Sequence, residues 1–254
     1  MDKSNIIEFD FTKKAKIPAD YHELSYFKEY KIKTIKGSKS ISNKKDLEVF
    51  YNLIKNIPNC TILDIGANKG YYALLTTLKE DLFVYSFEPL KNTYNNWLLQ
   101  NLKLNNVRNK VKTFNFGLLN ERCEKTLYYD NTENATIEKD LEKEAKILKE
   151  LERRPEAWTK YSESDVHFEK LDDIIEEDID QKIDVVKIDV EGSELLTLQG
   201  GEKFFREQKP LLFVEIEERH CKRFGTTVLE VINYLMSLGY VRFEQHNKIN
   251  YVCK

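Results

Sequence analysis

The chain is poor in cysteine, and its cysteines are far apart. The four of them, Cys60, Cys123, Cys221 and Cys253, form no C-x-x-C pair. Zinc clusters and disulfide frameworks depend on cysteines in regular, close spacing, so neither is indicated. Isolated cysteines fit a reducing environment, and the sequence therefore predicts a cytoplasmic protein.

The sequence also lacks long apolar runs and a large net charge. No segment approaches the length of a membrane span, and the first residues, MDKSNIIEFDF, lack the apolar core of a signal peptide. The formal net charge is −3, which creates no general field that would attract nucleic acid or an anionic membrane. We therefore expect no membrane span, and the small net charge disfavours a nucleic-acid partner.

Apolar residues, in contrast, are abundant and recur in alternating patterns. They make up 41% of the chain, with 14 Tyr and 14 Phe, which is enough for a packed core. Short apolar runs such as TILDI, LFVYSFE, VKTFNF, IDVVKID and PLLFVEIE are separated by segments with helical periodicity. This alternation predicts parallel strands joined by crossover helices. The last segments, YVRFEQ and KINYVC, predict a hairpin, so we expect a doubly wound α/β sheet whose C-terminal strand is antiparallel.

Two segments depart from this alternation. Residues 1–58 combine a polar arm with an amphipathic helix, and we expect them to cap a single domain formed by residues 59–254. Within that domain, residues at about 131–165 are rich in alternating charges and predict a helical insert. Such an insert is either a solvated surface helix or a lid over the substrate, and the sequence favours neither.

The segment TILDIGANKGYYALL places a glycine turn between a strand and a helix, where backbone N–H groups face a ligand. Gly66 and Gly70 do not match the G-x-G-x-x-G spacing of nicotinamide-binding turns. Asp64 precedes the first glycine by two residues, where an acid suits a positively charged amine better than a pyrophosphate. Glu88, at the end of the next strand, can accept hydrogen bonds from ribose hydroxyls. Together these features favour S-adenosylmethionine as the cofactor.

Several separate motifs resemble the FkbM family of S-adenosylmethionine-dependent methyltransferases. They are, in order, DIGANKGYYA, FEP, LDDII, DVVKIDVEGSELLTLQGG and PLLFVEIE, and they cover residues at about 59–220. The resemblance implies the seven-stranded Rossmann-like sheet of class I methyltransferases. It also implies methyl transfer to a hydroxyl oxygen, often on a sugar or a polyketide-type natural product. By this resemblance the cofactor-binding residues are Asp64, Gly66, Asn68, Gly70, Tyr71, Glu88, Pro89, Asn115, Phe116 and Gly117.

The strand segment VVKIDVEGSE carries the predicted chemistry. Lys187, Asp189 and Glu191 occupy alternate positions, so all three share one face at the carboxyl end of a central strand. We expect Asp189 to accept the proton of the acceptor hydroxyl, with Lys187 tuning Asp189 or stabilising the developing oxyanion. Glu191 would bind the substrate or a metal. Charges on a buried strand are costly unless they are paired or used, which favours this interpretation over a structural ion pair.

The next strand and its end add Glu215, Glu217 and His220 to the same crevice. A carboxylate cluster of this kind is compatible with Mg²⁺ or Mn²⁺, although the sequence gives no reason to require a metal.

The predicted activity is therefore transfer of a methyl group from S-adenosylmethionine to a hydroxyl of a nucleotide sugar, a glycan or a related small molecule. Two other activities stay open. An RNA ribose 2′-O-methyltransferase would need a basic groove formed by the lysines of residues 28–45. An NAD-dependent oxidoreductase is disfavoured by the glycine spacing. A non-catalytic protein that only binds the cofactor would not need the intact acidic cluster, so this alternative is less attractive. The sequence is also compatible with a homodimer.

Overall fold

The main sheet has seven strands, as predicted. The computed structural model describes residues 6–10, 31–35, 44–129, 135–137, 162–246 and 249–254. In sheet order the strands are β12 (Phe243–Gln245), β13 (Asn250–Cys253), β11 (Leu211–Glu215), β10 (Val185–Ile188), β3 (Thr61–Ile65), β4 (Phe83–Phe87) and β5 (Val111–Phe114). The five strands from β11 to β5 pair in parallel, whereas β13 pairs antiparallel with both β11 and β12. The doubly wound sheet with an antiparallel C-terminal strand is thus confirmed.

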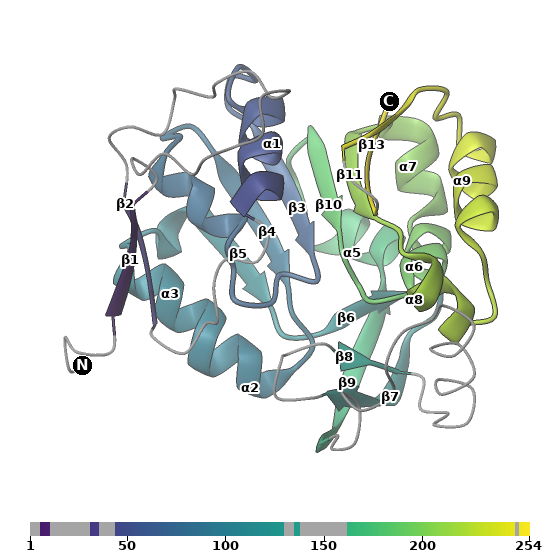
Figure 1. Cartoon of the computed structure of the whole chain (residues 1–254), viewed down its shortest axis with the longest axis horizontal. Coiled ribbons are helices and arrows are strands. Elements are labelled where there is room, and N and C mark those ends of the chain that lie inside the picture. Colours follow the sequence, from purple (N-terminus) through teal and green to yellow (C-terminus); the bar gives the residue numbers. More distant parts are fainter. Residues whose placement is uncertain (1–5, 11–30, 36–43, 130–134, 138–161, 247–248) are drawn as a thin grey trace.

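Helices cover both faces of this sheet because successive strand residues point to opposite sides (Figure 1). On β3, for example, Ile62 and Leu63 are both fully buried but belong to two different cores. The Ile62 core is closed by α1 (Lys44–Ile54), a 3₁₀ turn (Ala73–Thr77) and α3 (Leu99–Leu104). The Leu63 core is closed by α5 (Leu171–Glu177), α6 (Glu194–Gly200), α7 (Glu202–Gln208) and α9 (Val228–Ser237). The remaining helical segments are α2 (Lys91–Thr93), a π-helical turn (Tyr94–Leu98), a 3₁₀ turn (Arg108–Lys110) and α8 (Glu218–Arg223).

Two of the expected crossover helices are shorter than their sequence patterns predict. After β3 only the 3₁₀ turn forms, because Thr76 and Thr77 donate side-chain hydrogen bonds to carbonyls three residues earlier, which compete with the helical pattern. The long segment after β10 is split into α6 and α7 at Gly201, and Gly200 is the last residue of α6. A Cβ atom there would lie 2.0 Å from the carbonyl oxygen of Leu119, so glycine allows the helix end to touch a neighbouring strand.

A second sheet, which the sequence analysis did not predict, lies below the carboxyl ends of the main strands (Figure 1). Its order is β6 (Gly117–Leu119), β9 (Ser162–Lys170), β7 (Cys123–Tyr129) and β8 (Ala135–Thr136). Within the expected insert at about 131–165, β8 and the start of β9 are described, and both belong to this sheet. The charged run 138–154 lies outside the described residues.

The N-terminal arm is described only in part. Strand β1 (Ile6–Asp10) pairs antiparallel with β2 (Lys31–Ile35), which lies beside α3. The lysines of residues 36–43 lie outside the described residues. The predicted amphipathic helix is confirmed as α1, which buries Leu47, Phe50 and Ile54.

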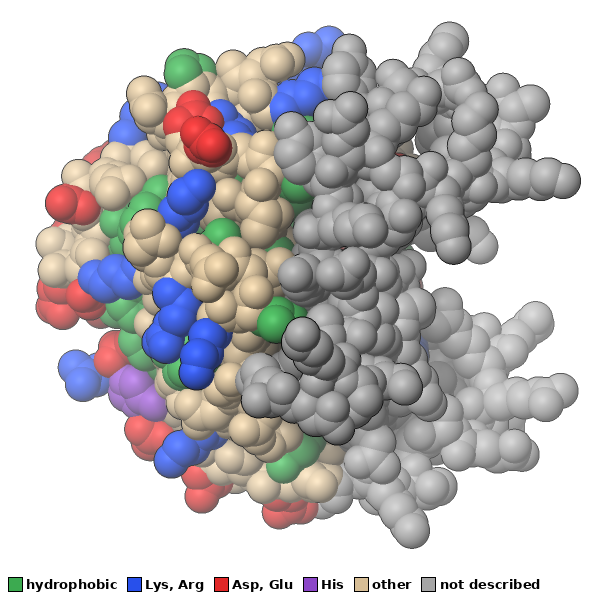
Figure 2. Space-filling view, turned by 90° about the vertical axis from the view of Figure 1, so that its left-hand side faces the viewer, with side chains coloured by type: hydrophobic (Ala, Val, Ile, Leu, Met, Phe, Trp, Pro, Cys, Tyr) green, Lys and Arg blue, Asp and Glu red, His purple; other side chains and the backbone are tan. Residues whose placement is uncertain are grey.

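Within the described part of the chain, every helix is too short or too polar to cross a membrane. On the face shown in Figure 2, the described surface carries both basic and acidic side chains, in keeping with the small net charge.

Candidate active site

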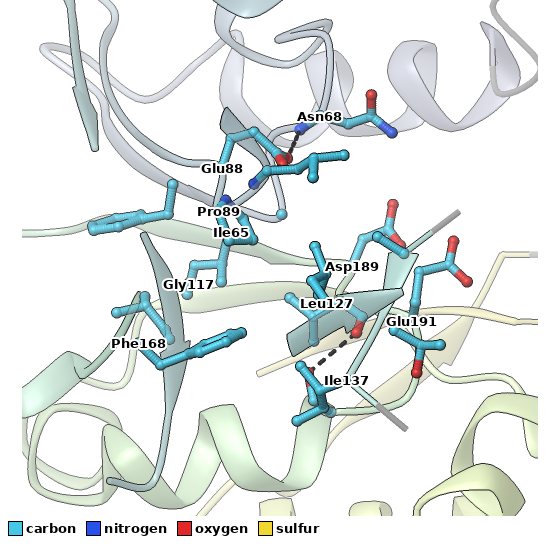
Figure 3. Close-up of a pocket in the computed structure, with 18 of the residues that line it drawn as sticks. Ile65, Asn68, Glu88, Pro89, Gly117, Leu127, Ile137, Phe168, Asp189 and Glu191 are labelled. Atoms are coloured by element: carbon cyan, nitrogen blue, oxygen red, sulfur yellow. Dashed lines mark hydrogen bonds between the residues drawn. The ribbon is translucent and has the colours of Figure 1, made fainter. Parts of the chain in front are cut away.

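A pocket opens where the carboxyl ends of β3, β4 and β10 face the second sheet. In Figure 3, Asn68 and Glu88 lie on one side of it, and Asp189 and Glu191 lie together on another. Ile137 and Phe168, from the segments of the second sheet, form a third side. The full lining consists of Ile65, Gly66, Asn68, Phe87, Glu88, Pro89, Leu90, Thr93, Gly117, Leu118, Leu127, Ala135, Thr136, Ile137, Phe168, Asp189, Val190, Glu191 and Ser193.

The glycine turn forms the roof of the pocket and is packed against β10. Gly66 has φ +75°, and a Cβ atom there would lie 1.9 Å from the carbonyl oxygen of Asp189. Only glycine fits such an approach. The backbone N–H groups of Gly66 and Ala67 donate to the Phe87 carbonyl, at 3.1 and 2.9 Å. Asn68 also has positive φ, and its Oδ1 is buried without a described hydrogen-bond partner. The turn thus offers a close backbone surface and an unsatisfied acceptor.

Glu88 is held in place by the same turn. Its Oε2 accepts from the Asn68 N–H at 2.9 Å, and its Oε1 accepts from the Leu90 N–H at 2.8 Å. Burial raises the pKa of Glu88 to about 7, although these two hydrogen bonds oppose the shift. Each carboxyl oxygen retains a second lone pair, so the group can still accept hydrogen bonds from a ligand.

Asn115, Phe116 and Gly117, which the family resemblance assigns to the cofactor site, have different positions. Asn115 does not line the pocket but donates to the carbonyls of Glu88 and Pro89, at 2.9 and 3.1 Å. Phe116 packs on the Phe87 and Phe114 rings behind the wall. Only Gly117 lines the pocket, and a Cβ atom there would lie 2.3 Å from the Phe168 ring.

Asp64 and Lys187 lie beneath the turn rather than on the pocket wall. Asp64 is fully buried, and burial raises its pKa against the opposing effect of Lys187. The Lys187 ammonium lies 3.5 Å from carboxyl oxygens of both Asp64 and Asp189. It also donates to the Gly66 carbonyl at 2.6 Å. Burial alone would lower the pKa of Lys187, but Asp189 and Asp64 outweigh it and the pKa is raised. Lys187 is therefore a charged group that supports the turn.

Gly70 and Tyr71, also expected at the cofactor, are absent from the pocket lining. Gly70 has φ +79° and packs against Leu98, while Tyr71 is half-buried beside the core closed by α1. They shape the turn from behind.

Asp189 and Glu191 reach the pocket from the segment that follows β10. Glu191 has φ +55°, a conformation that is uncommon for a residue other than glycine and that often marks a functional site. Its Oε2 lies 3.1 Å from Nε2 of His220. Burial raises the pKa of Glu191 to about 8, and the nearby Asp189 carboxylate adds to the shift.

Glu215 and His220 form a second row behind this pair and do not line the pocket. Burial raises the pKa of Glu215 to about 9, with Asp189 and Glu191 adding to it. Donor atoms of Glu215, Glu217 and His220 lie within 4.8 Å of one another. The Arg219 guanidinium lies 2.6 Å from Nε2 of His220 and 3.6 Å from Oε2 of Glu217. Glu217, Arg219 and His220 are therefore linked by close polar contacts.

Sequence reasoning missed the apolar wall. Leu118, Leu127 and Phe168 are buried residues of the second sheet that line the pocket. A signal was present, because Val166 and Phe168 alternate with polar residues in the segment SDVHFEK, as in a half-buried strand.

Comparisons with known proteins agree with this fold and site. The profile of the Methyltransferase FkbM domain matches residues 64–242. Methyltransferase sdnD of Sordaria araneosa is 32% identical over 163 residues, which are 58% of this chain and 62% of that protein. The crystal structure of methyltransferase FkbM from Methylobacillus flagellatus KT superimposes with a TM-score of 0.52 at 18% identity, which indicates a shared fold. That match covers 81% of this chain but 46% of the solved one, so the chain spans only part of both relatives. Because the family profile matches more than half of the chain, from the end of β3 through β11 and α9, the chain belongs to the FkbM methyltransferase family.

Proposed function

We propose that this chain transfers a methyl group from S-adenosylmethionine to a hydroxyl oxygen of a sugar or a related small molecule. Membership of a methyltransferase family supports methyl transfer. One observation carries the finer proposal: Asp189 and Glu191 share a single pocket with the Gly66 turn and Glu88. The pocket thus contains both candidate cofactor-binding groups and candidate proton acceptors, which supports the proposal.

The residues present suit the cofactor. The Gly66 turn leaves room for close backbone approach, and the buried Asn68 Oδ1 lacks a described partner. Glu88 can accept from ribose hydroxyls, while Gly117 and Phe168 provide a flat apolar surface for a base. When bound, S-adenosylmethionine supplies an electrophilic methyl group.

The chain's own residues would align the acceptor and receive its proton. Asp189 is 30% exposed at the pocket wall, so its carboxylate can accept the proton of a hydroxyl held beside it. The Lys187 ammonium lies 3.5 Å from Oδ2 of Asp189 and attracts this carboxylate electrostatically, which holds it in position at the pocket wall. Glu191 would orient a further hydroxyl of the acceptor. The apolar wall of Leu118, Leu127 and Phe168 would keep water away from the reacting atoms.

The proposal is tested by incubating the protein with isotopically labelled S-adenosylmethionine and a panel of acceptors. The panel contains nucleotide sugars, free glycans and hydroxylated natural products, with a ribose-containing RNA as the alternative acceptor. Each reaction is run with Mg²⁺ and with a chelator. Label in a sugar or small molecule as a base-stable methyl ether supports the proposal, whereas label in RNA alone contradicts it.

A further inference from the structure

The pocket carries a surplus of acidic side chains beside the glycine turn. Three carboxyl side chains line it, those of Glu88, Asp189 and Glu191. Among its described lining residues there is no Lys, Arg or His. A ligand that enters this pocket therefore meets acids as its only ionisable neighbours in the described wall.

The nearest cation compensates this charge only in part. The single Lys187 ammonium is shared between two carboxylates, at 3.5 Å from Asp64 and 3.5 Å from Asp189. This ammonium also donates to the Gly66 carbonyl at 2.6 Å, and Lys187 itself is not among the pocket-lining residues. One positive charge between two negative ones leaves a net negative charge, and Asp189 is the partner that reaches the pocket.

On the other side, the carboxyl groups repel one another. Asp189 raises the pKa of both Glu191 and Glu215, after the larger effect of burial. Arg219 and Arg223 lower the pKa of Glu191, but they do not cancel the shift. A positive charge on a ligand bound beside these carboxyl groups would therefore stabilise their ionised forms.

The glycine turn fixes where such a charge would be. Asp189 donates its N–H to the Ile65 carbonyl at 3.2 Å, and its own carbonyl leaves no room for a Cβ atom on Gly66. A ligand bound against the Gly66 turn thus has the Asp189 side chain as an adjoining group. Attraction between opposite charges at such short range, in a partly buried site, is stronger than in water.

We propose that Asp189 and Glu191 make this pocket selective for the positively charged cofactor over its uncharged thioether product. The inference rests on the proposed function. During methyl transfer the C–S bond breaks with its electron pair on sulfur, the O–C bond forms, and the hydroxyl proton passes to Asp189. The cofactor loses its positive charge and Asp189 loses its negative charge, so the attraction that held the cofactor disappears and product release is favoured.

The test is calorimetric titration of the full chain, which needs no acceptor. The ligands are S-adenosylmethionine, S-adenosylhomocysteine and sinefungin, an analogue with a charged amine in place of the methyl sulfonium group. In low salt, the two cationic ligands are expected to bind about tenfold more tightly than S-adenosylhomocysteine, and raising the salt concentration should narrow this difference.

The variants Asp189→Asn and Glu191→Gln keep the shape of each side chain and remove its ability to carry a negative charge. Each is expected to weaken S-adenosylmethionine binding by about tenfold and to leave S-adenosylhomocysteine binding unchanged. Glu207→Gln is the matched control, because Glu207 is an exposed acid on α7, next to the amino end of β11. It should bind all three ligands like the parent chain.

Equal affinity of the parent chain for charged and uncharged ligands would overturn the inference and leave the proposed function intact. If the variants bound S-adenosylmethionine and S-adenosylhomocysteine more weakly by the same factor, the inference would also be overturned. That result would indicate that Asp189 and Glu191 support the structure of the pocket rather than select for charge. Failure of the parent chain to bind any of the three ligands would overturn the proposed function as well. The comparison of ligands on the parent chain remains decisive even where a variant does not fold.

Discussion

The Lys187 ammonium lies 2.6 Å from the carbonyl oxygen of Gly66 and so ties β10 to the turn that follows β3. These strands are parallel neighbours, and their register places Lys187 directly beside Asp64. The same ammonium lies 3.5 Å from Asp189, a candidate proton acceptor. A single buried cation thus connects the cofactor turn with the candidate catalytic carboxylate.

Replacement of Lys187 by Met should therefore destabilise the fold and weaken cofactor binding together. Removing one partner of a buried ion pair leaves an uncompensated charge, which costs about 3 to 5 kcal/mol. Urea unfolding measures the stability, and calorimetric titration with S-adenosylmethionine measures the binding. The double variant Lys187→Met with Asp64→Asn removes the orphaned charge as well, so it should regain part of the stability. If the double variant is as unstable as the sum of the single ones, Lys187 does not act through Asp64.

The position of Lys187 illustrates what the sequence could and could not predict. Its spacing from Asp189 and Glu191 predicted that all three lie on one face of a strand, at its carboxyl end. Lys187 does lie in β10, whereas Asp189 and Glu191 lie in the segment that follows this strand. The contacts of Lys187 with Asp64 and with the Gly66 carbonyl depend on the register of β10 against β3 and on the conformation of the turn. Sequence spacing alone does not contain that information, so Lys187 was expected in the crevice and lies beneath the turn instead.

The second sheet shows a similar limit. The central strands of the main sheet could be predicted from the sequence because they are buried on both faces. Strands buried in this way appear in the sequence as short apolar runs. Strands β7 and β9 are mostly half-buried or exposed and carry charged residues, so their pattern is weak. They also flank the charged run of residues 138–154, which breaks the alternation. The apolar wall that these strands give to the pocket was missed for that reason.

Replacement of Gly66 by Ala should abolish cofactor binding. Gly66 has φ +75°, and an added Cβ atom would lie 1.9 Å from the Asp189 carbonyl oxygen, so the turn must move. Gly225 offers a matched control: it has φ +70°, but nothing lies within 4 Å of an added Cβ atom. Gly225→Ala should cost about 1 to 2 kcal/mol of stability from the left-handed backbone and leave binding intact. Similar binding by the two variants would show that close packing of the turn is not required.

Replacement of Asp189 by Ala should remove turnover while the protein still binds S-adenosylhomocysteine. Loss of a positioned proton acceptor reduces the rate by a factor of about 10² to 10⁴. The measurement is the initial rate at saturating S-adenosylmethionine with an acceptor identified by the panel, alongside calorimetric titration with S-adenosylhomocysteine. Unchanged turnover would remove Asp189 from the catalytic assignment. Turnover lost together with all ligand binding would point to a collapsed turn instead.

The free energy of unfolding of the ligand-free protein should fall as the pH rises from about 5 to 9. The pKa of Glu215 is raised from 4.5 to about 9, mainly by burial. Below pH 4.5 the group is protonated in both the folded and unfolded states, and its contribution to stability is fully present. Between the two pKa values the unfolded state has lost the proton and the folded state retains it, so folding becomes less favourable with each rise in pH. Glu215→Gln cannot ionise, so its stability should decline less steeply over this range in urea unfolding at successive pH values. The exposed Glu207→Gln should keep the parent slope. If the stability of Glu215→Gln declined with pH as steeply as that of the parent chain, Glu215 would be ionised in the folded protein. Another group would then cause the pH dependence of stability.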